Sequence, residues 1–215
     1  MSAEAALRED ICALAKSIFD RGLTHGSSGN ISARLEDGRL LVTPTGSSFR
    51  NLDPARLSVL AGDGQHLDGD KPTKEVALHT AFYDTRPTGA VVHLHSTHSV
   101  ALSVLPDIDP DNVLPPITAY SVMQLGRVRL LPYFRPGDPA MGDAVRGLAG
   151  KRSALLLANH GPVVAAKDLQ AAVNAVEELE VTAKLTLLTL GLRPRLLDNA
   201  AIGDLVRTFD IEWDD

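Results

Sequence analysis

Apolar residues recur at helical spacing in two long segments of the chain. Near the N-terminus they are three or four positions apart, at Leu7, Ile11, Leu14 and Ile18. This pattern predicts an amphipathic helix over residues 3–20. Gly22 lies where such a helix is expected to end.

A second apolar stripe lies in the C-terminal third of the chain and consists of Val173, Val176, Leu179, Ala183 and Leu187. It predicts a long helix, because the helical period is kept over several turns. Asp168 is suited to cap the first turn of this helix, and Gly191 marks its expected end.

Runs of β-branched and other apolar residues between these segments predict strands. Residues 31–43 flank the dipeptide Asp37-Gly38 and predict a hairpin. The runs AVVHLH (residues 90–95) and SALLLA (residues 153–158) predict two more strands, and the second continues through NHG into PVVAA. Residues 72–87 predict a short helix that Thr73 caps and Pro87 ends. Without a visible linker or repeat, we expect one α/β domain over residues 1–215 with an antiparallel layered arrangement.

Composition and charge exclude several classes of function. The formal net charge is −6 and the sequence pI is about 5.6, which argues against a nucleic-acid partner but not against a site for one small anion. No apolar run approaches the roughly 18 residues needed to span a bilayer. The N-terminal residues lack the apolar stretch of a signal peptide, and Cys12 is the single cysteine. We therefore expect a cytoplasmic protein without an internal disulfide and without a membrane partner.

Three histidines form the first candidate site. His93 and His95 are two residues apart on a predicted strand, so their side chains project from the same face. His160, in the turn between two predicted strands, is the candidate third ligand. Three imidazoles with one open position are typical of a catalytic zinc site. The residues alone also allow the alternative that these histidines have only packing roles.

Two further elements carry candidate chemistry. Glu75 lies about one turn into the predicted short helix, where its carboxylate either works near a metal and moves protons or only favours the helix N-terminus. The loop GSSGN (residues 26–30) offers hydroxyl, amide and backbone N–H groups that can surround a phosphate, and Thr45 and Gly46 add further donors. Small polar loops are commonly plain turns, so neither loop is specific when taken alone.

Together, these motifs resemble the class II aldolase family of the fuculose-phosphate and rhamnulose-phosphate aldolase type. The motifs occur in the order GSSGNIS, TPTG, PTKE, HLHSTH and NHG, over residues 26–161. The resemblance implies a three-layer α/β/α sandwich around a mainly antiparallel, mixed sheet. It also implies a homotetramer with active sites near subunit interfaces.

The resemblance assigns roles to individual residues. The implied zinc ligands are His93, His95 and His160. Glu75 matches the family's acid–base glutamate, which can also touch the metal. The implied phosphate-binding residues are Ser27, Asn30, Thr45, Gly46 and Thr73.

Lys74 departs from the sugar-phosphate aldolases, which carry a second serine at this position. Together with the segments VVHLHSTHSVALS, DPDNVLPPITAY and LLPYFRPGDPA, it makes the chain more similar to a subgroup, the 3-oxo-tetronate 4-phosphate decarboxylases. Lys74 either contacts the carboxylate of such a substrate or points to solvent. The subgroup implies metal-dependent decarboxylation to dihydroxyacetone phosphate and carbon dioxide through a metal-stabilised enediolate, in the catabolism of four-carbon acid sugars.

Two other functions stay open. An aldolase that splits a ketose phosphate into dihydroxyacetone phosphate and an aldehyde would use the same enediolate. A non-catalytic binding module, like the adducin head domains, is expected to lack the full metal set, which this chain has. Tyr120 is either a second acid or a core or interface residue, and Arg135 either orients an anion or pairs with Asp138. Three imidazoles suit zinc but also accept other divalent transition metals.

Overall fold

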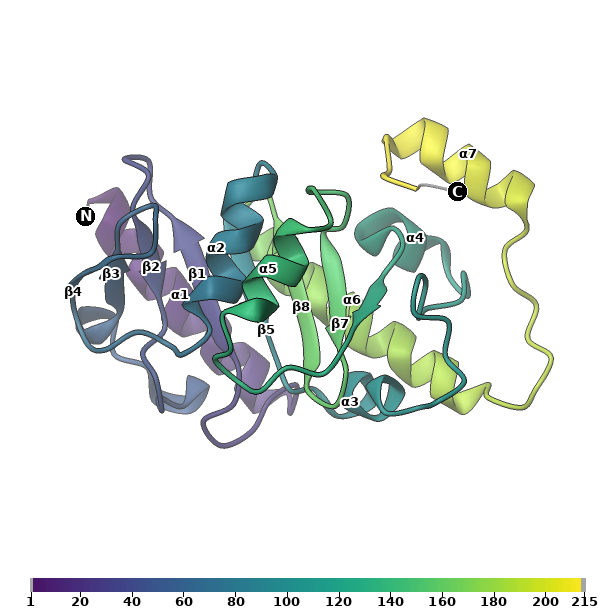
Figure 1. Cartoon of the computed structure of the whole chain (residues 1–215), viewed down its shortest axis with the longest axis horizontal. Helices are drawn as coiled ribbons and strands as arrows, with labels where there is room; N and C mark the ends of the chain where they lie inside the picture. Colours follow the sequence, from purple (N-terminus) through teal and green to yellow (C-terminus); the bar gives the residue numbers. More distant parts are fainter. Residues whose placement is uncertain (1, 214–215) are drawn as a thin grey trace.

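One mixed sheet runs through the protein, whose computed structural model describes residues 2–213 (Figure 1). Its eight strands lie in the order β4-β3-β2-β1-β5-β8-β7-β6. The strands are β1 (Asn30–Arg34), β2 (Leu40–Val42), β3 (Ser58–Leu60), β4 (His66–Asp68), β5 (Ala90–His93), β6 (Arg129–Leu131), β7 (Ala154–Leu157) and β8 (Gly161–Ala166). Neighbouring strands are antiparallel, apart from the parallel pair β6 and β7. The predicted mainly antiparallel, mixed sheet is confirmed.

Helices cover both faces of this sheet. The helices are α1 (Ala3–Asp20), α2 (Val76–Thr85), α3 (Thr97–Ser103), α4 (Ala119–Leu125), α5 (Ala140–Arg146), α6 (Leu169–Leu188) and α7 (Asn199–Phe209), with short 3-10 turns at Phe49–Asn51 and Pro54–Arg56. Figure 1 shows α2 and α5 side by side in front of the sheet, whereas α1 and α6 lie behind it. α7 packs against α4 near the C-terminal end of the chain (Figure 1). The three-layer α/β/α arrangement is therefore confirmed.

Alternation along the central strands divides the core into two apolar layers. In β5, Ala90 and Val92 belong to the layer shared with α1 and α6, whereas Val91 belongs to the layer shared with α2 and α5. Leu156 and Leu155 of β7 divide in the same way. Both faces of these strands are covered by helices, which explains why their sequences are continuous apolar runs.

The long periodic elements occur where the sequence predicts them. α1 spans the expected residues 3–20, and Gly22 follows it with a positive φ of 73°. α6 begins directly after Asp168, whose side chain accepts a hydrogen bond from the Ala171 N–H at 2.7 Å. β1 and β2 form the expected hairpin. No helix within residues 2–213 is long and apolar enough to cross a membrane.

Two boundaries differ from prediction, and both lie at the candidate site. β5 ends at His93, so His95 lies beyond the strand instead of within it. α2 begins at Val76, which makes Glu75 the residue before the helix and not a residue one turn inside it. The Thr73 hydroxyl accepts the N–H of Glu75 at 3.3 Å and thereby forms a turn ahead of the helix. Thr73 therefore does not occupy the N-cap position.

Gly161, the first residue of β8, allows two backbone segments to approach each other closely. A Cβ atom at this position would lie 2.2 Å from the carbonyl oxygen of Leu94, and the φ of 150° is one that L residues rarely adopt. Leu94 stands between His93 and His95, and His160 directly precedes Gly161. The close approach therefore brings the β7–β8 turn up to the end of β5.

The substitution Gly161→Ala is expected to lower the free energy of unfolding by about 2 kcal/mol or more, since overpacking costs about 1–3 kcal/mol and backbone strain adds to it. Urea denaturation followed by circular dichroism measures this change. Gly62→Ala is the matched control, because its new Cβ would meet only the Gly38 carbonyl oxygen at 3.4 Å, and a shift within about 0.5 kcal/mol is expected. Equal stability of the two variants would contradict the steric argument.

Candidate metal centre and substrate cavity

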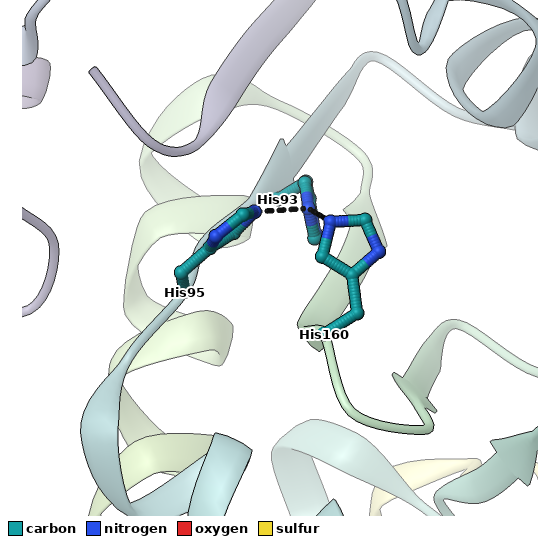
Figure 2. A group of neighbouring side chains, drawn as sticks. All are labelled: His93, His95 and His160. Carbon is teal, nitrogen blue, oxygen red and sulfur yellow. Dashed lines mark hydrogen bonds between the residues drawn. The ribbon is translucent and has the colours of Figure 1, made fainter. Parts of the chain in front are cut away.

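Three imidazole rings meet at one end of the central strand (Figure 2). His93 is the last residue of β5, His95 follows two residues later, and His160 lies in the turn between β7 and β8. The Nε2 atom of His93 is 3.2 Å from that of His95 and 3.3 Å from that of His160. The structure thus brings together the three histidines that the sequence predicts as ligands.

Hydrogen bonding and burial fix the state of these rings. Nδ1 of His93 donates to the carbonyl oxygen of Pro162 at 2.8 Å, which directs its Nε2 atom toward the other two rings. Burial, together with the neighbouring His93, lowers the pKa of His95 to about 3 and that of His160 to about 4. Both rings are therefore neutral near pH 7 and available as ligands.

Glu75 completes the cluster from the opposite side. Its Oε2 atom is 3.4 Å from Nε2 of His93, and its Oε1 atom is 3.3 Å from Nε2 of His160. Burial by itself would raise the pKa of Glu75, but His93 and a 2.8 Å hydrogen bond from Nδ2 of Asn30 outweigh it and lower the pKa below the ordinary value. The carboxylate is therefore ionised, and Oε1 has no hydrogen-bond partner within residues 2–213.

These donor atoms fit a divalent metal ion. Nitrogens about 2.0–2.1 Å from one tetrahedral zinc ion lie about 3.3–3.4 Å apart, close to the two observed Nε2 separations of 3.2 and 3.3 Å. Neutral imidazoles with lone pairs that face one another, next to a carboxylate oxygen without a donor, are unfavourable unless a cation lies between them. The chemistry and the spacing of the donor set both match a metal centre.

A polar cavity of about 230 Å³ opens onto this cluster. Most of the residues predicted for catalysis or substrate binding line it, namely Ser27, Asn30, Thr45, Gly46, Thr73, Lys74, Glu75, His95 and His160. His93 is fully buried beside His95. The two predicted phosphate loops, Lys74 and the histidine cluster therefore surround one cavity.

The predicted phosphate contacts differ in how available they are. Ser27 and Gly46 are exposed at the cavity, whereas Asn30 is 6% exposed and already bonds to Glu75. The Thr45 N–H donates to the Lys71 carbonyl oxygen at 2.9 Å, which leaves the Thr45 hydroxyl as its free group. One N–H of the Asn30 carboxamide therefore bonds to Glu75, and the other is left for a substrate.

Tyr120 lies apart from this cavity in the described chain. It is on α4 and is 63% exposed. Arg135 is exposed next to Pro136, which does line the cavity. Neither side chain is among those that surround the histidine cluster.

Glu180 is a structural partner of the site that sequence reasoning missed. This α6 carboxylate is 7% exposed and accepts hydrogen bonds from the N–H groups of His98 and Ser99, both at 2.9 Å, and from both of their side chains. It thereby anchors the first turn of α3, which begins two residues after His95. A charged residue on the buried face of a long apolar helix was the available signal.

Three converging imidazoles, one carboxylate and an open polar cavity define a candidate metal centre of the catalytic kind, which leaves room for a substrate. The chain belongs to the class II aldolase and adducin N-terminal domain family, whose sequence profile matches residues 9–187.

Two curated relatives and one solved structure illustrate this membership. The chain is 53% identical over 204 residues to the 3-oxo-tetronate 4-phosphate decarboxylase of Escherichia coli strain K12, with 94% of this chain and 96% of the relative covered. It is 34% identical over 174 residues to the L-fuculose phosphate aldolase of the same strain, with 80% and 78% covered. The crystal structure of YgbL from Escherichia coli matches with a TM-score of 0.93 at 50% identity and covers 95% of this chain and 99% of that one.

The substitution His95→Ala is expected to weaken zinc binding by more than about 100-fold, because removing a group that merely orients a ligand already costs about 10–100-fold. Titration of metal-free protein with zinc, followed by metal analysis after gel filtration, measures the change. His66→Ala is the control, since His66 lies on β4 outside the cluster and bonds to the Asp68 carbonyl oxygen. Wild-type zinc affinity in His95→Ala would rule out this metal centre.

Proposed function

We propose that this protein decarboxylates a 3-oxo-tetronate 4-phosphate to dihydroxyacetone phosphate and carbon dioxide. The observation that carries this proposal is the 53% identity, over nearly the whole chain, to a protein named for that reaction. The site supports it, because one cavity combines candidate phosphate donors, a lysine and a metal cluster. A substrate with a phosphate at one end and a carboxylate at the other needs all three.

The proposed metal ligands are His93, His95 and His160, with Glu75 able to join them. A divalent ion bound there would act as a Lewis acid on the substrate oxygens and stabilise the negative charge that develops as carbon dioxide leaves. Zinc is the proposed ion, because three imidazoles and an open position suit it.

Glu75 is the proposed acid–base residue. The bond between the carboxylate carbon and carbon 2 of the substrate breaks, and its electron pair stays with the substrate's carbon 2, which becomes the hydroxymethyl carbon of dihydroxyacetone phosphate. A proton must then be added at carbon 2, and Glu75 is buried beside the cluster with Oε1 free of other hydrogen bonds within residues 2–213. We assign the transfer of this proton to Glu75 Oε1: the ionised carboxylate would take up one proton from solvent and pass it to this carbon.

The two ends of the substrate are assigned to different walls of the cavity. The proposed phosphate-binding residues are Ser27, Asn30, Thr45, Gly46 and Thr73. Lys74 is assigned to the substrate carboxylate, because it is exposed at the same cavity. The placement beside Glu75 keeps the carboxylate near the residue that replaces it with a proton.

A second candidate function is aldol cleavage of a ketose phosphate. The 34% identity to L-fuculose phosphate aldolase supports it, and the same metal cluster and Glu75 would serve. Lys74 favours the decarboxylase, because the aldolase substrate has no carboxylate for it to contact. The complete set of three histidines and a glutamate favours either enzyme over a non-catalytic binding module.

The wider setting of the enzyme is proposed from the same resemblance. We infer a single catalytic domain over residues 1–215, a homotetramer, a cytoplasmic location and a role in the catabolism of four-carbon acid sugars. Its partner is a small phosphorylated acid sugar, without nucleic acid or membrane.

Zinc-loaded protein is expected to release carbon dioxide and dihydroxyacetone phosphate in equal amounts from a 3-oxo-tetronate 4-phosphate, because loss of the carboxylate is the only bond cleavage the reaction requires. A coupled end-point assay for both products measures this ratio, and metal-free protein is the control. If fully loaded protein releases no carbon dioxide, the decarboxylase assignment fails, and ketose phosphates become the substrates to test.

Lys74→Met is expected to raise KM for the carboxylate-bearing substrate by about tenfold or more, since a hydrogen bond to a charged group contributes about 1.5–3 kcal/mol. Lys71→Met is the matched control, because Lys71 is also exposed but lies outside the cavity. Steady-state kinetics on both variants measures the effect. Equal KM values for the two variants would return Lys74 to a solvent-exposed role.

A further inference from the structure

Three polar residues at a spacing of four lie along one side of α2, the first of them at its N-cap position. Glu75 directly precedes the helix, and His79 and Tyr83 follow it at successive turns. Opposite them, β1 presents Asn30 and Ser32, which are two residues apart and therefore project from the same face. His79 is 1% exposed and Ser32 is fully buried. Two elements distant in sequence thus enclose a row of buried polar side chains.

These five side chains form one continuous chain of hydrogen bonds. Tyr83 contacts the Ser32 hydroxyl at 2.9 Å, and Ser32 contacts Nδ1 of His79 at 2.7 Å. Nε2 of His79 bonds to Oδ1 of Asn30, whose Nδ2 donates to Oε2 of Glu75 at 2.8 Å. The chain therefore begins at a phenol in the core and ends at the carboxylate beside the metal cluster.

The chemistry of the groups fixes the direction of every bond in this chain. The ionised Glu75 carboxylate only accepts, so Asn30 must turn its NH₂ group toward it and its Oδ1 toward His79. Oδ1 also only accepts, so His79 carries its proton on Nε2 and accepts at Nδ1 from Ser32. The Ser32 oxygen then accepts from Tyr83. Burial lowers the pKa of His79 to about 3, which keeps the ring neutral as this arrangement requires.

We infer that His79 is a positioning residue for Glu75, because its Nε2–H holds the Asn30 carboxamide in the one orientation that donates to the Glu75 carboxylate. This inference rests on the proposed acid–base role of Glu75. The hydrogen bond from Asn30 matters, because Oε1 of Glu75 has no hydrogen-bond partner within residues 2–213. Without the donor on His79, the buried Oδ1 of Asn30 would be unpaired, and rotation of its carboxamide toward the open cavity would become favourable.

The test compares two substitutions of His79 that differ in reach. Gln places its side-chain nitrogen near the position of Nε2 and keeps a donor for Asn30, whereas Asn reaches only the position of Nδ1. His79→Asn is expected to lower kcat by about 10–100-fold, the usual effect of losing a group that orients a functional residue, and to change kcat more than KM. His79→Gln is expected to restore kcat to near the wild-type value. His79→Leu replaces His79→Asn if the latter does not fold.

A double-mutant cycle with Glu75→Gln decides whether His79 acts through Glu75. If it does, His79→Asn has no further effect on kcat once Glu75 has been replaced. Additive losses, or a rise in KM at unchanged kcat, would overturn the inference. Each variant is also titrated with Co²⁺, and a loss of metal binding in His79→Asn that Glu75→Gln does not share would equally overturn it, because the effect would then extend beyond Glu75.

Phe82→Leu is the stability control, since Phe82 is a buried apolar residue of α2 and takes no part in the hydrogen-bond chain. It should lower the free energy of unfolding while kcat stays at the wild-type value, and a parallel loss of kcat would mean that any damage to α2 suffices. The result is separable from the proposed function. If the wild type releases no carbon dioxide, the same cycle is measured on a ketose phosphate, whose cleavage would use the same Glu75.

Discussion

Four groups with lone pairs are held facing one point in this protein, and the surrounding structure is what keeps them there. The Nε2 atom of His93 is 3.2–3.3 Å from those of His95 and His160. They are fixed because His93 ends the central strand and hydrogen-bonds to the Pro162 carbonyl oxygen, while Gly161 lets β8 pass close to Leu94. Glu180 anchors the chain just beyond His95. The fold thus prepares the cluster for the proposed cation.

Long helices were easier to predict from the sequence than short strands and helices. α1 and α6 were predicted from sequence, because apolar stripes along helices of 18 and 20 residues leave little ambiguity of period. β3, β4 and β6 have three residues each and α3, α4 and α5 have seven, which is too short for a pattern to show. The boundaries at His93 and Glu75 depend on contacts from elsewhere. The Thr73 N–H, for example, bonds to the Thr43 carbonyl oxygen, and no local rule reveals this contact.

The candidate site was predictable to a different extent. His93, His95, His160 and Glu75 do meet, because their residue types and spacing carry their own chemical signature. Their supporting partners were not predicted. His98 and Glu180 are 82 residues apart, and His79 and Asn30 are 49 apart. The role of a buried polar residue depends on its hydrogen-bond partner, and only the folded structure reveals which residue that partner is.

Burial divides the proposed cavity into an inner and an outer part with different tasks. Asn30, Glu75 and His160 are buried, so charge that develops there is poorly screened, and electrostatic stabilisation is strong. Ser27, Gly46 and Lys74 are exposed, so they can contact a substrate before its inner end loses water. Decarboxylation and aldol cleavage leave the same kind of negative charge on the carbon skeleton, so the inner part need not differ between the two reactions. In the proposed function, the choice between them falls to the outer part, where Lys74 would add the charge that a second anionic group requires. Such a division would be consistent with the similarity of this chain to both a decarboxylase and an aldolase.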